Sequence, residues 1–339
     1  MTEKLKTDAK NYESSIKRSA EILKNSGIVA IPTETVYGLA ASALDENAIK
    51  KVFEAKGRPQ DNPLIVHISN MDMLYEIACN IPKEALICAE KFWPGPFTMV
   101  LPRTDKTAPC VSAGLNTVAV RMPDHETALD IINESRLPLA APSANVSGSP
   151  SPTTAFHVKN DLDGKIDAIV YDSECNVGVE STVVSFCCNP PRLLRPGAVT
   201  PQQLCEIIPD LEIDKAILNQ LEKDAKVESP GMKYKHYAPK TECYLVEGNA
   251  EDFINYVNER ENCVAVCFSD ESAHITAPKI IYGKADDEKT LAHEVFSVLR
   301  KVDDLGCEEV FIHAPSKYGI GLAVYNRLLR ACSFRVIEL

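Results

Sequence analysis

Residues 15–31 read SIKRSAEILKNSGIVAI, a helical pattern that runs directly into a strand pattern. The apolar residues Ile16, Ala20 and Leu23 recur at the spacing of one helix face. Gly27 supplies a helix stop, and the four apolar residues after it predict a buried strand. The chain therefore begins with a helix followed by a strand.

The same alternation continues through the first two hundred residues. Helices are expected at 46–55, 87–92 and 126–133, and strands at 64–68, 97–101, 117–121, 139–141, 168–171, 181–186 and 192–195. The late strands are closely spaced, which favours an irregular or mixed sheet over a doubly wound one. We therefore expect a first domain of the α/β class built on a mixed sheet.

A second alternation follows a break in the chain. Residues 204–226 look helical and highly charged, and Pro230-Gly231 must break that helix, which marks a linker. Beyond it, strands at 243–247, 264–268, 279–282 and 309–313 alternate with helices at 251–260, 288–305 and 323–331, which is typical of a small parallel α/β domain. The expected parts are a first domain over 1–210, a linker over 211–240 and a second domain over 241–339.

The length and composition exclude several classes of protein. A chain of 339 residues exceeds what one hydrophobic core usually supports, and no apolar run approaches the ~18 residues of a membrane span. The polar, acid-containing start MTEKLKTDAKNYESS lacks the features of a secretory signal, so we expect a cytoplasmic protein. The net charge of −12 opposes strong binding to a long nucleic acid, so an anionic substrate needs a local group of Lys and Arg side chains.

Cysteine and glycine patterns exclude common metal and nucleotide sites. The 12 cysteines include no Cys-x-x-Cys pair, so neither a disulfide framework nor a zinc site is expected. The sequence has no Gly-x-x-x-x-Gly-Lys-Ser/Thr loop. Gly319-Ile-Gly321 matches part of a dinucleotide-binding fingerprint, but Val324 stands where the third glycine belongs, so a tight turn is the better interpretation.

Two proline-framed loops carry polar groups instead. Pro32-Thr-Glu-Thr-Val-Tyr-Gly38 leaves a strand, and loops at strand ends commonly carry function. In Lys56-Gly-Arg58, an extended backbone would project both cations to the same side, where they repel unless an anion lies between them. Solvated surface charges also explain such a pair. We favour a phosphate site in which both side chains are partly exposed.

Further polar residues follow later strands. Arg121 ends an apolar strand and suits bidentate binding of a carboxylate, although it could be a solvated strand tip. Ser143 and Asn145 lie two residues apart after a proline and can present a hydroxyl and an amide to one face, although a plain loop also explains them.

Ser181 lies at a strand start, Arg195 lies at a strand end, and His67 is more often explained as a satisfied core histidine. No nucleophile–base spacing stands out, so the inventory favours positioning and charge neutralisation over covalent catalysis.

Taken together, Lys56-x-Arg58 and Ser143-x-Asn145 resemble the signature of the YrdC-like family, the L-threonylcarbamoyladenylate synthases. Further matches are Pro32-Thr-Glu-Thr-Val-Tyr-Gly38, Phe92-Trp-Pro-Gly-Pro-Phe-Thr98, Val118-Ala-Val-Arg-Met-Pro123 and Ser229-Pro-Gly-Met-Lys-Tyr-Lys-His-Tyr-Ala-Pro239. The resemblance covers nearly the whole chain and implies the long form. In that form a twisted, open, mixed sheet with helices is joined by a lid-like linker over the active site to a Rossmann-like parallel α/β domain.

The resemblance also implies a reaction and a set of site residues. L-threonine, bicarbonate or CO2, and ATP become L-threonylcarbamoyl-AMP and diphosphate, the first stage of N6-threonylcarbamoyladenosine formation at position 37 of tRNA. Catalysis is assigned to Lys56, Arg58, Ser143 and Asn145. Threonine would contact Thr35, His67, Arg121, Ala141 through its backbone, and Ser181. ATP would contact Lys56, Arg58, Asn62, Thr117, Ser143, Asn145, Ser151, Arg195 and Tyr237, with Tyr234 and His236 as equal candidates for the linker contact.

We expect catalysis by positioning, with Mg²⁺ bound through ATP, no metal site of the protein and no tightly bound organic cofactor. Other proteins would receive the product, there would be no membrane partner, and contact with tRNA would be weak or indirect. Two alternatives are an RNA-binding module without catalysis, which the net charge opposes, and a carbamoyltransferase of the hydrogenase-maturation type, which would carry Cys-x-x-Cys pairs.

Overall fold

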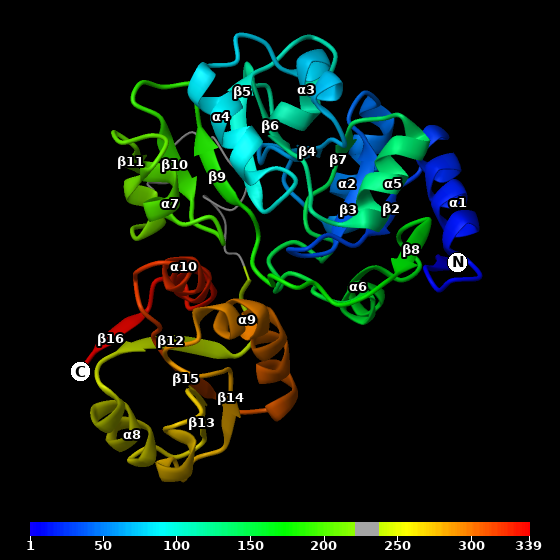
Figure 1. Ribbon diagram of the computed structural model, residues 1–339. Helices are drawn as coiled ribbons and strands as arrows, with labels where there is room; N and C mark the ends of the chain where they lie inside the picture. Colours follow the sequence, from blue (N-terminus) through cyan, green and yellow to red (C-terminus); the bar gives the residue numbers. More distant parts are fainter. Residues whose placement is uncertain (221–236) are drawn as a thin grey trace.

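The computed structural model describes residues 1–220 and 237–339, which form two α/β domains, each on its own sheet (Figure 1). The first domain, coloured blue to green, lies above the second, coloured yellow to red, in this view. No helix in the described ranges is long and apolar enough to cross a membrane. The predicted limits of the two domains and the linker stay a prediction, because residues 221–236 lie outside these ranges.

Within residues 1–220 the first sheet has 11 strands in the order β1-β8-β2-β3-β7-β4-β6-β5-β9-β10-β11. The pairs β2·β3, β3·β7, β5·β6 and β9·β10 are antiparallel, whereas β1·β8, β4·β6 and β5·β9 are parallel, so the expected mixed sheet is confirmed. The strands are β1 (Glu3–Lys6), β2 (Val29–Ile31), β3 (Gly38–Ser42), β4 (Ile65–His67), β5 (Phe97–Pro102), β6 (Thr117–Arg121), β7 (Leu139–Ala140), β8 (Ala168–Tyr171), β9 (Thr182–Ser185), β10 (Arg192–Arg195) and β11 (Glu212–Ile213).

Helices cover this sheet with their apolar faces. In α2 (Glu46–Lys56) the buried face includes Ile49, Val52 and Phe53, and the side chain of Asp45 caps the amino end by accepting from two backbone N–H groups. The other helices are α1 (Tyr12–Lys24), α3 (Met71–Ile77), α4 (Lys83–Phe92), α5 (Glu126–Ser135), α6 (Ala155–Leu162) and α7 (Pro201–Cys205), with 3₁₀ turns at Pro109–Ser112 and Lys215–Ile217.

Within residues 237–339 the second sheet has five strands in the order β14-β13-β15-β12-β16, all of them parallel. This confirms the expected parallel α/β domain. The strands are β12 (Glu242–Glu247), β13 (Cys263–Cys267), β14 (Lys279–Ile281), β15 (Glu309–His313) and β16 (Val336–Glu338), and the helices are α8 (Ala250–Asn258), α9 (Glu288–Val302) and α10 (Gly321–Ala331), with 3₁₀ turns at Ser272–His274 and Asp303–Leu305.

One predicted helix is wrong. The charged segment 204–226 does not continue as a helix, because α7 ends at Cys205 and the chain then forms strand β11 and a 3₁₀ turn. Pro209 lies inside the segment and has no backbone N–H for a helical hydrogen bond, which explains the stop. Residues 221–226 of that prediction lie outside the described residues. The sequence reasoning also missed β1, β3, α3, α6 and β16.

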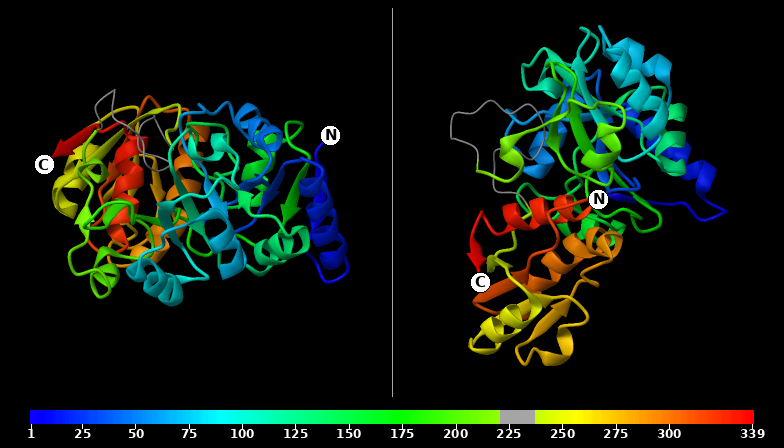
Figure 2. Two further views of the ribbon diagram at one scale, coloured as in Figure 1. Left: turned by 90° about the horizontal axis from the view of Figure 1, so that it is seen from above. Right: turned by 60° about the vertical axis from the view of Figure 1, so that its left-hand side comes forward.

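The second domain packs directly on the loops of the first. Helices α9 and α10 face the first domain in Figure 1 and in the right-hand view of Figure 2. Val36 and Val179 of the first domain are buried in the same hydrophobic cluster as Phe296 of α9. Gly178, at φ +80°, lies so close to the backbone of α9 that a Cβ atom there would be 2.5 Å from the carbonyl oxygen of Ala292. The two domains therefore share a packed boundary.

Candidate active site

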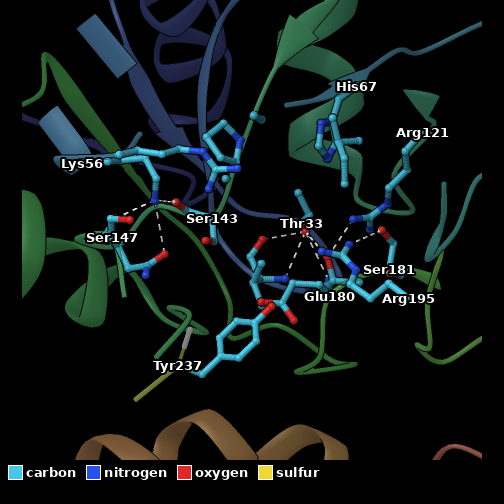
Figure 3. Close-up of a pocket in the computed structure, with 18 of the residues that line it drawn as sticks. Thr33, Lys56, His67, Arg121, Ser143, Ser147, Glu180, Ser181, Arg195 and Tyr237 are labelled. Atoms are coloured by element: carbon cyan, nitrogen blue, oxygen red, sulfur yellow. Dashed lines mark hydrogen bonds between the residues drawn. The ribbon is translucent and has the colours of Figure 1, made fainter. Parts of the chain in front are cut away.

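A cavity lies where several strand ends of the first sheet meet. Figure 3 shows Lys56 with Ser143 and Ser147 on one side, Arg121, His67, Ser181 and Arg195 on the other, and Glu180 and Tyr237 between them. The lining residues are Thr33, Thr35, Val36, Gly38, Lys56, Arg58, Ile65, His67, Arg121, Ala141, Pro142, Ser143, Asn145, Ser147, Gly148, Ser149, Glu180, Ser181, Arg195 and Tyr237.

Lys56 is held differently from the prediction. It is the last residue of α2, and Gly57 ends the helix at φ +60°, so the expected extended backbone through Lys56 is wrong. Its side chain is 1% exposed, not partly exposed. Nζ donates to the carbonyl oxygens of Ser143 at 2.5 Å and Asn145 at 2.6 Å. Burial, and then the charge of Arg58, lowers the pKa of Lys56. Lys56 therefore holds the 143–145 loop.

Arg58 is half-buried and lines the cavity, as predicted for a partly exposed side chain. Its Nη2 donates to the carbonyl oxygens of Pro63 at 3.2 Å and Asn62 at 3.4 Å. Asn62 itself is buried and does not line the cavity. Among the described residues, Oδ1 of Asn62 has no hydrogen-bond partner. Arg58 therefore lines the cavity, whereas Asn62 contacts Arg58 through its carbonyl oxygen.

Asn145 orders the loop that faces Lys56. Its Nδ2 donates to the carbonyl oxygens of Val146 and Ser149, both at 2.8 Å. The backbone N–H of Ala144 donates to the carbonyl oxygen of Tyr37 at 2.7 Å, which joins this loop to the 32–38 loop. The loop residues 147–149 line the cavity and were not predicted.

Arg121 ends β6 with its guanidinium buried among three partners. Nη2 pairs with Glu34 at 2.5 Å, Nη1 donates to Oγ1 of Thr35 at 2.8 Å, and Nε donates to the carbonyl oxygen of Gly95 at 3.2 Å. Oγ1 of Thr35 also lies 2.9 Å from Oγ1 of Thr33. The alternative of a solvated strand tip is therefore excluded, and Glu34 is a partner that the sequence reasoning missed.

His67 lies beside Arg121 in the cavity wall and is 3% exposed. Burial, and then the charge of Arg121, lowers the pKa of His67 to about 3, so its imidazole is neutral at pH 7. Its Nδ1 has no hydrogen-bond partner within the described part of the chain. His67 therefore offers the cavity a neutral imidazole.

Arg195 ends β10 and holds Ser181, which directly precedes β9. Its Nε donates to the carbonyl oxygen of Ser181 at 3.0 Å, and Nη2 donates to Oγ of Ser181 at 3.1 Å. Oγ of Ser181 also lies 2.7 Å from Oγ1 of Thr98. Burial, and then the charge of Arg327, lowers the pKa of Arg195 to about 10, so it remains a cation at neutral pH.

Three predicted ATP residues do not line the cavity. Asn62 is buried and accepts from Arg58 through its carbonyl oxygen, and Thr117 opens β6, about 13 Å along the strand from Arg121 at ~3.3 Å per residue. Ser151 is fully buried, and its Oγ donates to Oε1 of Glu180 at 2.5 Å. Tyr237 lines the cavity, whereas Tyr234 and His236 lie outside the described residues. The predicted linker lid lies mostly outside them as well.

The charge pattern of the cavity suits an anionic ligand. Lys56, Arg58, Arg121 and Arg195 line it, and the lining carboxylate of Glu180 is paired with Arg327 of α10 at 2.7 Å. Across residues 1–220 and 237–339, no group of three His, Cys, Asp or Glu side chains could hold a metal ion.

Comparisons with known proteins cover nearly the whole chain. A family model described as "Telomere recombination" matches residues 21–197, and one described as "Threonylcarbamoyl-AMP synthase, C-terminal domain" matches residues 199–333. A threonylcarbamoyl-AMP synthase of Pyrococcus abyssi is 44% identical over 333 residues, which are 96% of each chain. That of Bacillus subtilis is 42% identical over 344 residues, covering 100% of this chain and 97% of the relative.

A solved structure of P. abyssi Sua5 complexed with L-threonine matches with a TM-score of 0.91 at 39% identity, and covers 100% of this chain and 99% of that one. A variant of the same protein matches with a TM-score of 0.93.

Proposed function

The chain belongs to the Sua5/YciO/YrdC family in its two-domain, threonylcarbamoyl-AMP synthase form, and we propose that its cavity makes threonylcarbamoyl-AMP from L-threonine, bicarbonate or CO2, and ATP. It is an adenylate-forming nucleotidyltransferase. Diphosphate is the second product. The product serves the formation of N6-threonylcarbamoyladenosine at position 37 of tRNA, and further proteins transfer the threonylcarbamoyl group.

The observation that carries the proposal is a single cavity with buried cations at separate places in its wall. We assign binding of the threonine carboxylate to Arg121. Glu34 and Thr35 already hold two nitrogens of its guanidinium, so the group needs no reorganisation when the carboxylate binds. Ser181 and Ala141 line the same cavity and complete the threonine site.

The phosphates of ATP are anionic, so they fit the positively charged side chains of the cavity. Arg58 and Arg195 line it, and Arg195 stays protonated at neutral pH because its pKa falls only to about 10. Ser143 and Asn145 stand on the loop that Lys56 fixes, so we assign Lys56 to loop positioning as well as charge. Tyr237 lines the same space and is assigned to the nucleotide.

The reaction then needs positioning more than covalent help from the protein. The neutral amine of threonine forms an N–C bond with CO2 and loses a proton, or with bicarbonate and releases water, which gives a carbamate in either case. A carbamate oxygen forms a bond with the α-phosphorus of ATP, and the bond to diphosphate breaks. Both partners are anions, so fixed cations lower the cost of bringing them together. We propose that Mg²⁺ enters with ATP, held by its phosphates.

We place the reaction in the cytoplasm. All 12 cysteines are free in the structure, which agrees with a reducing compartment.

The test is incubation of the full chain with threonine, bicarbonate and ATP, followed by mass detection of the adenylate and measurement of diphosphate. Leaving out threonine or bicarbonate should abolish the product. Diphosphate release that does not depend on threonine would contradict the proposal. A covalent adduct of the protein trapped during turnover would contradict the positioning mechanism alone.

A further inference from the structure

A buried arginine of the second domain reaches the wall of the cavity. Arg327 of α10 is 0% exposed, and its Nε donates to Oε2 of Glu180 at 2.7 Å. Glu180 lines the cavity, and its other oxygen accepts from Ser151 at 2.5 Å. Both carboxylate oxygens are therefore occupied, one of them by a residue that lies 147 positions further along the chain.

The same guanidinium ties two cavity loops together. Nη2 of Arg327 donates to the carbonyl oxygen of Glu180 at 3.2 Å, and Nη1 donates to that of Pro196 at 2.9 Å. These carbonyls belong to the residues directly before Ser181 and directly after Arg195. A planar fork that holds both segments fixes their separation, because guanidinium donors have a rigid geometry.

The Glu180 carboxylate is an obstacle in a site for anions unless it is neutralised. Burial raises the pKa of Glu180, but the charges of Arg327 and Arg195 and the Ser151 hydrogen bond outweigh burial and lower the pKa overall. Glu180 is therefore ionised at neutral pH. Without Arg327 the negative charge of the Glu180 carboxylate, beside Tyr237 and Arg195, would be poorly balanced. It would then repel the triphosphate of ATP.

We propose that Arg327 is a positioning residue for the nucleotide end of the site: it neutralises Glu180 and holds the Arg195 segment at a fixed distance from Glu180. The second domain thereby completes the cavity wall. This inference rests on the proposed function, and it assigns the second domain a part in ATP binding.

Helix α10 provides a matched control for this role. Arg330 lies one turn further along, is 7% exposed, and donates from Nη2 to the carbonyl oxygen of Ala216 at 2.9 Å. Like Arg327 it is a buried arginine that joins α10 to the first domain, but it does not contact Glu180 through any hydrogen bond that the described residues make. Its loss should weaken domain packing and leave the Glu180–Arg327 pair in place.

The experiment compares R327M, R330M and E180Q/R327M in the full chain, with KM for ATP, KM for threonine and the Kd of ATP measured by calorimetry. We expect R327M to raise KM and Kd for ATP at least about tenfold, because removal of one partner leaves a buried charge uncompensated. KM for threonine should change less than the two ATP constants do. R330M should shift the ATP constants by less than about threefold. E180Q/R327M should recover most of the loss in ATP affinity, since the unbalanced charge is removed.

Equal effects of R327M and R330M would overturn the inference, because Arg327 would then act only through domain packing. Failure of E180Q to rescue ATP affinity would also overturn the neutralising role. If R327M does not fold, R327K replaces it, and it should give an intermediate ATP constant because a lysine keeps the charge but loses the fork. The calorimetric Kd separates this inference from the proposed function. If the wild-type chain binds ATP but forms no adenylate, only the proposed function is contradicted.

Discussion

The contact of Gly178 with α9 makes a sharp test of the domain boundary. A Cβ atom at this position would lie 2.5 Å from the carbonyl oxygen of Ala292 and 2.7 Å from that of His293, and would also meet Cα of His293. All three are backbone atoms of a helix, so no side chain can move aside. Gly178→Ala must therefore push the first domain and α9 apart or distort the loop that leads to Ser181.

The expected cost has two parts that a control can separate. Alanine at φ +80° costs about 1–2 kcal/mol of backbone strain. Overpacking against a fixed backbone adds about 1–3 kcal/mol. Gly164 has the same φ of +80°, yet its Cβ position has no atom within 4 Å among the described residues. Gly164→Ala should therefore show the strain alone.

The assay is urea unfolding of both variants, followed by far-UV circular dichroism and by the fluorescence of Trp93, the single tryptophan of the chain. Gly178→Ala should lower the free energy of unfolding by about 1–3 kcal/mol more than Gly164→Ala does. It should also reduce adenylate formation, since the loop carries Glu180 and Ser181. Equal destabilisation by the two substitutions would refute the close packing of this loop on α9.

Three further predictions concern the cavity. Lys56→Met should lower the unfolding free energy by about 1–3 kcal/mol in addition to weakening ATP binding, because two buried carbonyls of the 143–145 loop lose their donor; unchanged urea unfolding would contradict the buried position. Glu34→Gln should raise the Kd of threonine about tenfold and leave that of ATP unchanged in calorimetry, because Arg121 loses the charge that orients it. The pKa of His67 in the folded state is lowered from 6.5 to about 3, so on acidification the unfolded chain binds a proton before the folded chain does, and the free energy of unfolding falls as pH drops from about 6.5 toward 3. Between pH 7 and 5 the free energy of unfolding of His67→Gln should therefore fall less than that of the wild type, as urea unfolding at each pH would measure.

Much of the fold could be predicted because it depends on local patterns. Strands β6, β8, β10 and β15 match their predicted limits residue for residue, since each is a short apolar run bounded by turn or polar residues. Elements whose signal is not local were missed. β1 is a polar strand at the edge of the sheet that the described residues form, and it pairs with β8 more than 160 residues away; β3 reads as a loop because Gly38 opens it. The wrong helix at 204–226 came from charge pattern alone, and Pro209 overrules it.

The sequence predicts the cationic residues of the site but not the residues that pair with them. Arg58, Arg121 and Arg195 stand at element ends next to prolines or turns, and a single sequence reveals that much. Lys56 was found for the wrong reason, because its helix extends one residue further than expected and turns Nζ inward onto carbonyl oxygens. Long-range pairs such as Glu180 with Arg327 leave no local spacing to detect.

The buried carboxylates explain how an acidic protein can keep an anion site. Glu34 and Glu180 each lie next to the cavity and each is paired with an arginine, Arg121 in the first case and Arg327 in the second. Pairing with Glu34 fixes the orientation of Arg121 at the cavity before the substrate arrives, whereas the fully buried Arg327 balances the charge of Glu180 without lining the cavity. Because Glu34 and Arg121 belong to the first domain and Arg327 to the second, loss of domain packing should impair the nucleotide end before the threonine end. Threonine binding that survives a substitution at the domain boundary while ATP binding fails would be the direct sign of this division.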